Sequence, residues 1–194
     1  MLLERTPGRV LLGITGPPGA GKSTLAERLV AALAPAAVLV PMDGFHLAEV
    51  ELERLGLRDR KGAPETFDAA GFVALLERLR AGRDDVVYAP TFRRDLEEPI
   101  AGAVPVPRDV RLVVTEGNYL LLARPPWARV RALLDEVWYC AVPDEARLVR
   151  LAARHERFGR SSEEAWARTR GSDQRNAELV ASTAAGADLV VPTG

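Results

Sequence analysis

A glycine-rich phosphate-binding motif near the N-terminus constrains this chain more than any other feature. Residues 16–23 read Gly-Pro-Pro-Gly-Ala-Gly-Lys-Ser and complete the pattern G-x-x-x-x-G-K-[ST]. An apolar run, 10–14, precedes the motif and an apolar-periodic segment, 25–33, follows it, as a strand–loop–helix setting requires. In that setting backbone N–H groups and the helix N-terminus bind phosphate oxygens. We therefore expect a nucleotide to be bound by Gly16, Pro17, Pro18, Gly19, Ala20, Gly21, Lys22, Ser23 and Thr24.

Lysine is rare in this chain. Only Lys22 and Lys61 are lysines among 26 basic residues. An arginine-rich chain is expected to keep lysine where a compact ammonium cannot be replaced by a planar guanidinium. The motif predicts that Lys22 reaches the β- and γ-phosphates and that the Ser23 hydroxyl binds Mg²⁺. Lys61 is then either a second functional lysine or an ordinary surface residue.

Composition excludes several classes of protein. The 194 residues are 47% hydrophobic with a net charge of −1, which predicts one domain over 1–194, no nucleic-acid surface and no membrane span. The single cysteine, Cys140, lies in an apolar run and is expected to be a buried thiol, with no intrachain disulfide. Segment 1–9 lacks the apolar core of a signal peptide, so we expect a cytoplasmic protein. Monomer and homodimer both stay open.

The distribution of apolar runs predicts an α/β fold. Helical segments separate buried strands expected near residues 10–15, 38–40, 112–115, 136–142 and 188–192. Such alternation implies right-handed crossovers and a parallel sheet covered on both faces. With the phosphate-binding motif, this predicts a three-layer α/β/α P-loop NTPase with a mainly parallel five-stranded sheet. We expect a short helix at 126–134 and irregular structure across the three prolines of 89–106.

Two carboxylates follow predicted strands, where ligands of parallel sheets bind. Glu116 is predicted to order Mg²⁺, with a turn-capping carboxylate as the alternative. Asp43 is predicted to accept a proton from an acceptor hydroxyl as a general base, with an aspartate that stabilises the turn at Gly44 as the alternative.

A predicted helix over 144–158 carries arginines three and four residues apart, which places them on one face. Their function would be to close over a transferring phosphoryl group, for which Arg154 and Arg150 are the first candidates. A solvated helix face is the alternative. His46, three residues past Asp43, is expected to line an acceptor pocket, whereas His155 is expected on the helix surface.

Four further stretches, in order along the chain, resemble the uridine kinase, pantothenate kinase and phosphoribulokinase group of P-loop kinases. They are Pro-Met-Asp-Gly-Phe-His (41–46), Arg-Lys-Gly-Ala-Pro-Glu-Thr-Phe-Asp (60–68), Tyr-Ala-Pro-Thr-Phe-Arg-Arg (88–94) and Glu-Gly-Asn-Tyr-Leu-Leu-Leu (116–122). The likeness covers nearly the whole chain and is greatest to short nucleoside kinase-like and sugar-transport-associated kinase-like members. Uridine kinases usually carry Ser-Phe-Tyr where this chain has Gly44-Phe45-His46, so the acceptor is not identified by the motif.

The resemblance implies an ATP-dependent kinase that uses Mg²⁺ and phosphorylates a hydroxyl of a nucleoside, a pantothenate-like alcohol or a sugar. It assigns Asp43 as general base, and Arg147, Arg150 and Arg154 resemble lid arginines. We expect a helical lid at about 154–172 and an acceptor-site insert at about 43–106. The expected acceptor-binding residues are Phe45, His46, Lys61, Glu65, Tyr88, Arg93 and Asn118.

The charge of the acceptor depends on two of these residues. Lys61 and Arg93 favour an acceptor with an acidic group, unless both pair with carboxylates such as Glu65 or Asp95. The alternative function is a nucleotide-hydrolysing switch or assembly ATPase without a small acceptor. Against it stand Asp43 and the lack of the Asn-Lys-x-Asp run by which GTPase switches read guanine.

Overall fold

The predicted strands form one parallel sheet in the order β2-β5-β1-β6-β7 among the residues that the structure describes. The computed structural model describes residues 3 and 8–193, so the expectation for segment 1–9 lies almost wholly outside it. The strands are β1 (Val10–Thr15), β2 (Ala37–Pro41), β5 (Leu112–Glu116), β6 (Glu136–Ala141) and β7 (Leu189–Pro192).

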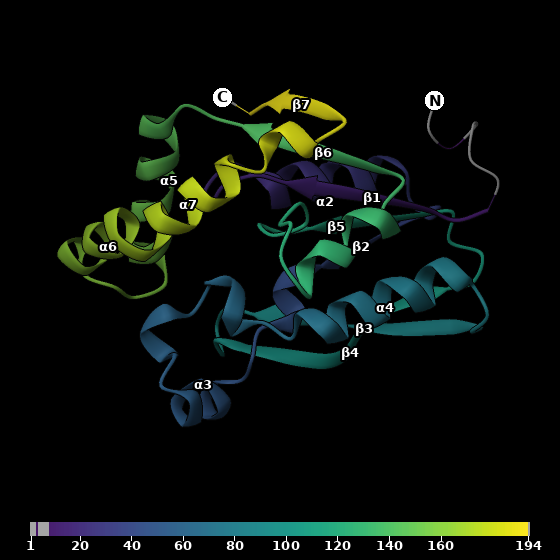
Figure 1. The fold of residues 1–194 in the computed structure, drawn as a ribbon, viewed down its shortest axis with the longest axis horizontal. Coiled ribbons are helices and arrows are strands. Elements are labelled where there is room, and N and C mark those ends of the chain that lie inside the picture. Colours follow the sequence, from purple (N-terminus) through teal and green to yellow (C-terminus); the bar gives the residue numbers. More distant parts are fainter. Residues whose placement is uncertain (1–2, 4–7, 194) are drawn as a thin grey trace.

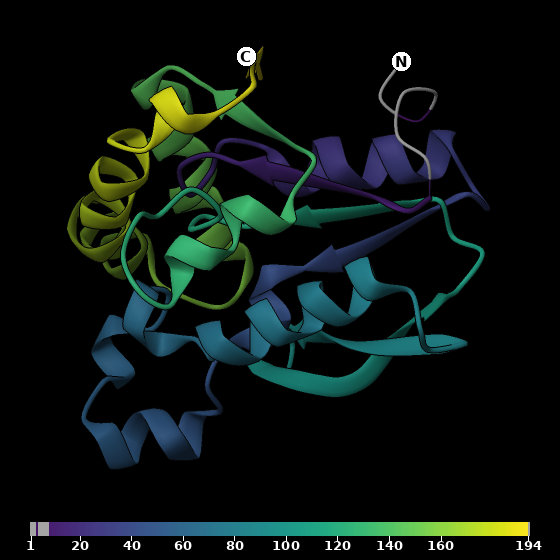
Figure 2. The same ribbon diagram turned by 45° about the vertical axis from the view of Figure 1, so that its right-hand side comes forward.

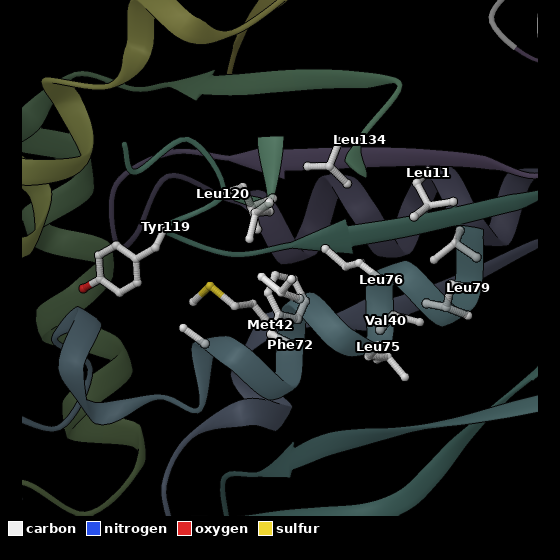
Figure 3. Close-up of a cluster of buried hydrophobic side chains, with 14 of the residues drawn as sticks. Leu11, Val40, Met42, Phe72, Leu75, Leu76, Leu79, Tyr119, Leu120 and Leu134 are labelled. Carbon is white, nitrogen blue, oxygen red and sulfur yellow. The ribbon is translucent and has the colours of Figure 1, made fainter. Parts of the chain in front are cut away.

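Both faces of the sheet are covered by helices. Side chains alternate along a strand, so β1 sends Leu12 into one apolar cluster and Leu11 into another. Helix α2 (Lys22–Ala32) covers the first face, and α4 (Ala69–Ala81) packs on the second (Figure 1). Figure 3 shows Leu75, Leu76 and Leu79 of α4 in the apolar cluster that includes Leu11 and Val40. The predicted three-layer α/β/α fold is confirmed.

Two helices begin at residues whose side chains cap the first turn. The side chain of Asp68 accepts a hydrogen bond from Gly71 N at 2.8 Å and begins α4, which ends at Gly82 with φ 58°. Ser161 and Glu164 form a reciprocal capping box at the start of α6 (Ser162–Arg168).

The C-terminal helices gather at one end of the sheet (Figure 1). They are α5 (Asp144–Arg157), α6, a π-helical turn (Thr169–Asp173) and α7 (Gln174–Ala181). The expected lid at 154–172 corresponds to the end of α5, α6 and most of the π-helical turn. In the described residues no helix is long and apolar enough to cross a bilayer.

The segment expected to be irregular is instead a β-hairpin. Strands β3 (Val86–Arg93) and β4 (Glu98–Pro107) pair in an antiparallel ribbon that lies with α3 (Glu49–Leu55) away from α2 (Figure 2). The prediction was wrong because prolines, which lack an N–H, are tolerated on the two free edges of a two-stranded ribbon. The register shifts between Ala89 and Thr91, at Pro90.

The prediction of one continuous helix at 126–134 was also wrong. The chain there makes two short 3₁₀ turns, Trp127–Arg129 and Arg131–Leu133, after a Pro-Pro pair.

Candidate active site

The phosphate-binding loop requires glycine for two reasons. Gly16, Gly19 and Gly21 have φ of 147°, 82° and 81°, angles that L side chains rarely adopt. A Cβ on Gly19 would also lie 2.9 Å from the backbone oxygen of Arg147. The loop therefore packs directly against α5, and this contact places the lid helix next to the nucleotide site.

Lys22 lies inside this loop. The residue is 8% exposed, and its Nζ donates to the backbone oxygen of Pro17 at 3.1 Å. Burial lowers the pKa of Lys22, and the nearby carboxylates of Glu116 and Asp43 oppose that shift. The only positive charge of the loop is thus held close to two acids.

Ser23 and Glu116 meet at the ends of α2 and β5. The hydroxyl of Ser23 donates to Glu116 Oε1 at 3.0 Å, and Glu116 is 6% exposed. Burial, together with the charge of Asp43, raises the pKa of Glu116. A hydroxyl and a carboxylate beside a phosphate-binding loop fit Mg²⁺, which takes few protein oxygens and completes its shell with water and phosphate. Among the described residues no group of three or more His, Cys, Asp or Glu side chains is arranged to hold a metal alone.

Asp43 lies near Lys22 and Glu116 but belongs to a different element. It lies in the 3₁₀ turn Met42–Phe45 after β2, and its Oδ2 accepts from Arg94 Nη2 at 3.0 Å. Burial disfavours the charged form of Asp43, but the surrounding positive charges, with Arg94 in contact, hold the pKa below its ordinary value. Asp43 is therefore ionised at neutral pH.

A cavity of about 460 Å³ brings these groups together. From the residues that the sequence singled out, the structure places on its walls Pro18, Lys22, Ser23, Asp43, His46, Lys61, Glu116, Asn118 and Arg154.

Two residues expected at the acceptor lie elsewhere because they belong to other packing contacts. The ring of Phe45 packs edge-on against Phe72, with centroids 5.2 Å apart. Glu65 pairs with Arg60 and lines a second, separate cavity.

Three further residues that the sequence had singled out for the site lie on outer surfaces. Tyr88 is 60% exposed on β3, and Arg93 forms an ion pair with Asp95, with Nη2 to Oδ2 at 2.6 Å. Arg150 points away from the cavity and donates to the backbone oxygen of Thr193 at 2.9 Å. Among the arginines of α5, Arg154 is the one that lines the cavity.

Sequence reasoning missed several residues of the cavity. Arg94 is the last residue of the 88–94 stretch that carries the family resemblance, and its place there was the signal that could have identified it instead of Arg93. Arg168 and Asp173 also line the cavity, but they come from the lid and carry no local sequence signal.

The expectation for His155 was wrong. Its side chain is 13% exposed and lines the cavity, and its Nε2 lies 2.7 Å from Asp173 Oδ2. The turn of the lid after α5 buries a ring that helical periodicity had placed on the surface.

Cys140 is buried in β6, as expected. Burial raises its pKa to about 11, so the thiol is protonated at neutral pH. It is therefore not a nucleophile.

Comparison with known proteins gives a consistent result. The model of the AAA_33 family, described as an AAA domain, matches residues 11–175. The chain is 36% identical over 194 residues to the Schizosaccharomyces pombe protein named "Putative uridine kinase C227.14", covering 94% of this chain and 83% of that protein.

Two further similarities extend this result. A crystal structure described as a "putative fructose transport system kinase" from Silicibacter sp. TM1040 is 42% identical, with a TM-score of 0.88, over 97% of this chain and 92% of that chain. The pantothenate kinase of Nocardioides sp. is 36% identical over 126 residues, which are 62% of this chain and 37% of that enzyme.

Proposed function

The chain belongs to the AAA_33 family of P-loop kinase domains and is an ATP-dependent small-molecule kinase, and we propose that its cavity transfers the γ-phosphate of MgATP to a hydroxyl of a sugar, nucleoside or pantothenate-like acceptor. The observation that carries this proposal is the position of Asp43. An ionised carboxylate from a separate element lies in the same cavity as Lys22, Ser23 and Glu116.

On the nucleotide side, the loop 16–24 binds the phosphates through its N–H groups. Lys22 neutralises charge on the β- and γ-phosphates, and Ser23 with Glu116 would hold Mg²⁺. The ion, when bound, supplies charge stabilisation to the phosphate oxygens. Glu116 must be ionised for this role, even though burial favours its neutral form.

On the acceptor side, Asp43 takes the proton of the attacking hydroxyl. The acceptor oxygen forms a bond to the γ-phosphorus as the bond from that phosphorus to the β–γ bridging oxygen breaks, and ADP carries away the electron pair. Arg94 holds the Asp43 carboxylate in place through its hydrogen bond. Arg154 has no hydrogen-bond or ion-pair partner among the described residues and lines the cavity, so its guanidinium is free to contact the transferring phosphoryl group.

The test is release of ADP from MgATP with nucleosides, pantothenate, and free and phosphorylated sugars, with Lys22→Ala as the blank. Release that depends on one class of acceptor and is lost in the blank identifies the substrate class. Release that needs no acceptor, yet is lost in the blank, would contradict the proposal and favour a nucleotide-hydrolysing switch or assembly ATPase.

A further inference from the structure

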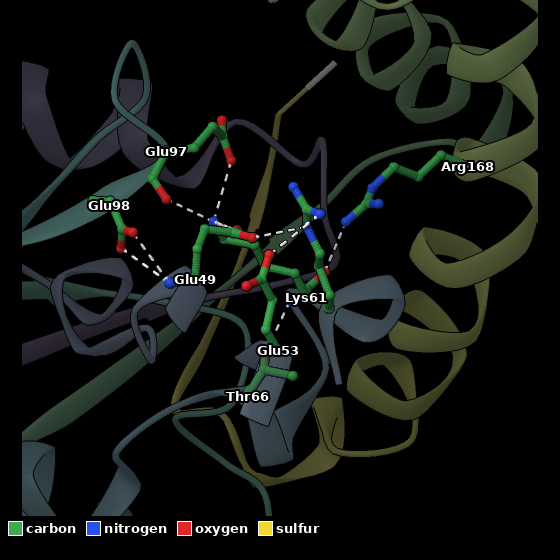
Figure 4. A network of polar contacts seen from close by, with 9 residues as sticks. Glu49, Glu53, Lys61, Thr66, Glu97, Glu98 and Arg168 are labelled. Carbon is green, nitrogen blue, oxygen red and sulfur yellow. Dashed lines mark hydrogen bonds and ion pairs between the residues drawn. The ribbon is translucent and has the colours of Figure 1, made fainter. Parts of the chain in front are cut away.

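Lys61 was a candidate to bind an acidic group of the acceptor, but its ammonium already lies between two carboxylates. Its side chain is 10% exposed and bonds to the Glu49 carboxylate and to the backbone oxygen of Glu97 at 2.6 Å, with Glu97 Oε2 at 3.5 Å (Figure 4). Two of the three ammonium N–H donors are thus hydrogen-bonded, and the Glu97 carboxylate lies at ion-pair distance. The positive charge of Lys61 is therefore already balanced by two carboxylates before an anionic ligand binds.

These partners are fixed by the backbone as well as by charge. Glu97 has φ 55° and is the non-glycine residue with positive φ among those described, in the turn between β3 and β4. The next residue, Glu98, accepts a hydrogen bond from the backbone N of Glu49 at 3.1 Å. A ligand acid would have to displace carboxylates that the hairpin tip and α3 hold around a largely buried ammonium, which is unfavourable.

The other cations near Asp43 also have partners, apart from Arg154, which we place at the transferring phosphoryl group. Arg94 donates to Asp43 itself, and Arg93 pairs with Asp95 outside the cavity. On the lid, hydrogen bonds from Ser161 lower the pKa of the Glu164 carboxyl, and the charge of Arg160 adds a smaller effect. Besides Arg154, Arg168 is a cation of this cavity without a carboxylate partner among the described residues, and its Nη2 donates to the backbone oxygen of Lys61 at 2.9 Å.

One uncharged polar group of the cavity, in contrast, is unsatisfied. His46 Nδ1 is buried without a hydrogen-bond partner, and the ring stacks on Phe67 with centroids 3.9 Å apart. Burial lowers the pKa of His46, with opposition from Asp43, so the ring is neutral at pH 7. A neutral imidazole nitrogen and the Asn118 amide can exchange hydrogen bonds with hydroxyls.

We propose that the acceptor is an uncharged, hydroxyl-rich molecule, recognised by His46 and Asn118, and that Glu49 and Glu97 exclude acidic analogues by neutralising Lys61. This inference rests on the proposed kinase function. It favours a free sugar, polyol or nucleoside over a carboxylated alcohol or a sugar phosphate.

The experiment compares matched pairs that differ by one carboxylate: glucitol with gluconate, panthenol with pantothenate, and uridine with orotidine. Binding is measured by calorimetry in the presence of ADP, and turnover by ADP release. We expect a neutral member to bind at least roughly tenfold more tightly than its acidic partner. Tighter binding by an acidic member, or binding by no neutral member, overturns the proposal, and Arg168 is then the group that recognises the acid.

The variant Glu97→Gln sharpens the test, with Glu53→Gln as a matched control. Glu53 is on the same helix as Glu49 but pairs with Arg58 and lies outside the cavity. Glu97→Gln should shift the neutral-to-acidic preference toward the acid by roughly tenfold, and Glu53→Gln should leave it unchanged. An unchanged ratio in Glu97→Gln overturns the role of the carboxylates. If a neutral member binds but stimulates no ADP release that depends on Lys22, the kinase proposal fails while the inference on acceptor charge stands.

Discussion

The two sides of the cavity are built in different ways. The nucleotide side, residues 16–24 with Glu116, is a contiguous loop between a buried strand and a helix, joined by one acid from the neighbouring strand. The acceptor side comprises the turn at Asp43, the loop at Lys61, the hairpin tip at Glu97 and the lid. Its segments come from distant parts of the chain and are joined by ion pairs and single hydrogen bonds.

This difference explains which part can vary. Backbone N–H groups bind phosphate whatever the neighbouring side chains are, so the nucleotide side depends on the geometry of the loop and on only three side chains, Lys22, Ser23 and Glu116. The acceptor side depends on charge matching among side chains, and one substitution there can alter the ligand class. Relatives with sugar, nucleoside and pantothenate names are consistent with such a division.

The largest expected effect separates chemistry from nucleotide binding. Asp43→Asn should lower kcat by about 10²- to 10⁴-fold, the range for a positioned base, while the Kd for ATP stays unchanged. Asp95→Asn, at an exposed carboxylate, is the control. Steady-state kinetics with nucleotide titration checks this, and loss of ATP binding together with turnover would make Asp43 a structural residue.

Two glycine substitutions should affect the two sides separately. A Cβ on Gly44 would lie 2.5 Å from the backbone oxygen of Pro90, so Gly44→Ala should push the Asp43 turn from the hairpin and cost about 1–3 kcal/mol. It should raise KM for the acceptor, whereas Gly19→Ala should raise KM for ATP. Gly171→Ala, which meets nothing within 4 Å, is the control. The comparison fails if both variants change the same KM.

Substitution of Arg94 tests how the acceptor side sets the pKa of Asp43. Arg94→Gln should lower kcat/KM roughly tenfold, the equivalent of about 1.4 kcal/mol. Because Arg94 helps to hold the pKa of Asp43 low, its removal should raise that pKa and move the acid limb of the pH profile to higher pH. Arg93→Gln, on the neighbouring but outward-facing residue, should change neither quantity. An unmoved acid limb in Arg94→Gln would remove Asp43 from the titration that controls activity.

The smallest expected effect is a gain in stability, not a loss of activity or stability. The folded protein raises the pKa of Glu116 above its unfolded value, so the ionised carboxylate destabilises the fold at neutral pH, and this cost decreases as the pH falls through the folded pKa. Glu116→Gln should therefore raise the stability of the ligand-free protein by about 1 kcal/mol, or roughly 2–4 °C in Tm, although it impairs turnover. Thermal unfolding without nucleotide or Mg²⁺ measures this, and a lower Tm would contradict it.

Local patterns were enough for much of the fold. The phosphate-binding loop and the buried strands depend on neighbours within a few residues, so the sequence predicted them correctly. The β3–β4 hairpin was not predicted, because its prolines are tolerated only once two edge strands pair.

The same distinction between local and tertiary information applies to the candidate site. The sequence alone predicted that Lys22, Ser23, Asp43 and Glu116 belong to one site, because phosphate-binding chemistry favours those residue types at the ends of adjacent strands, and all four line one cavity. Only the tertiary structure decided that Lys61 is neutralised by Glu49 and Glu97, that Arg94 rather than Arg93 reaches Asp43, and that His155 and Arg168 line the cavity. These partners lie from 12 to 107 residues apart, and no local pattern reports which charges will meet across such distances once the lid and the hairpin pack together.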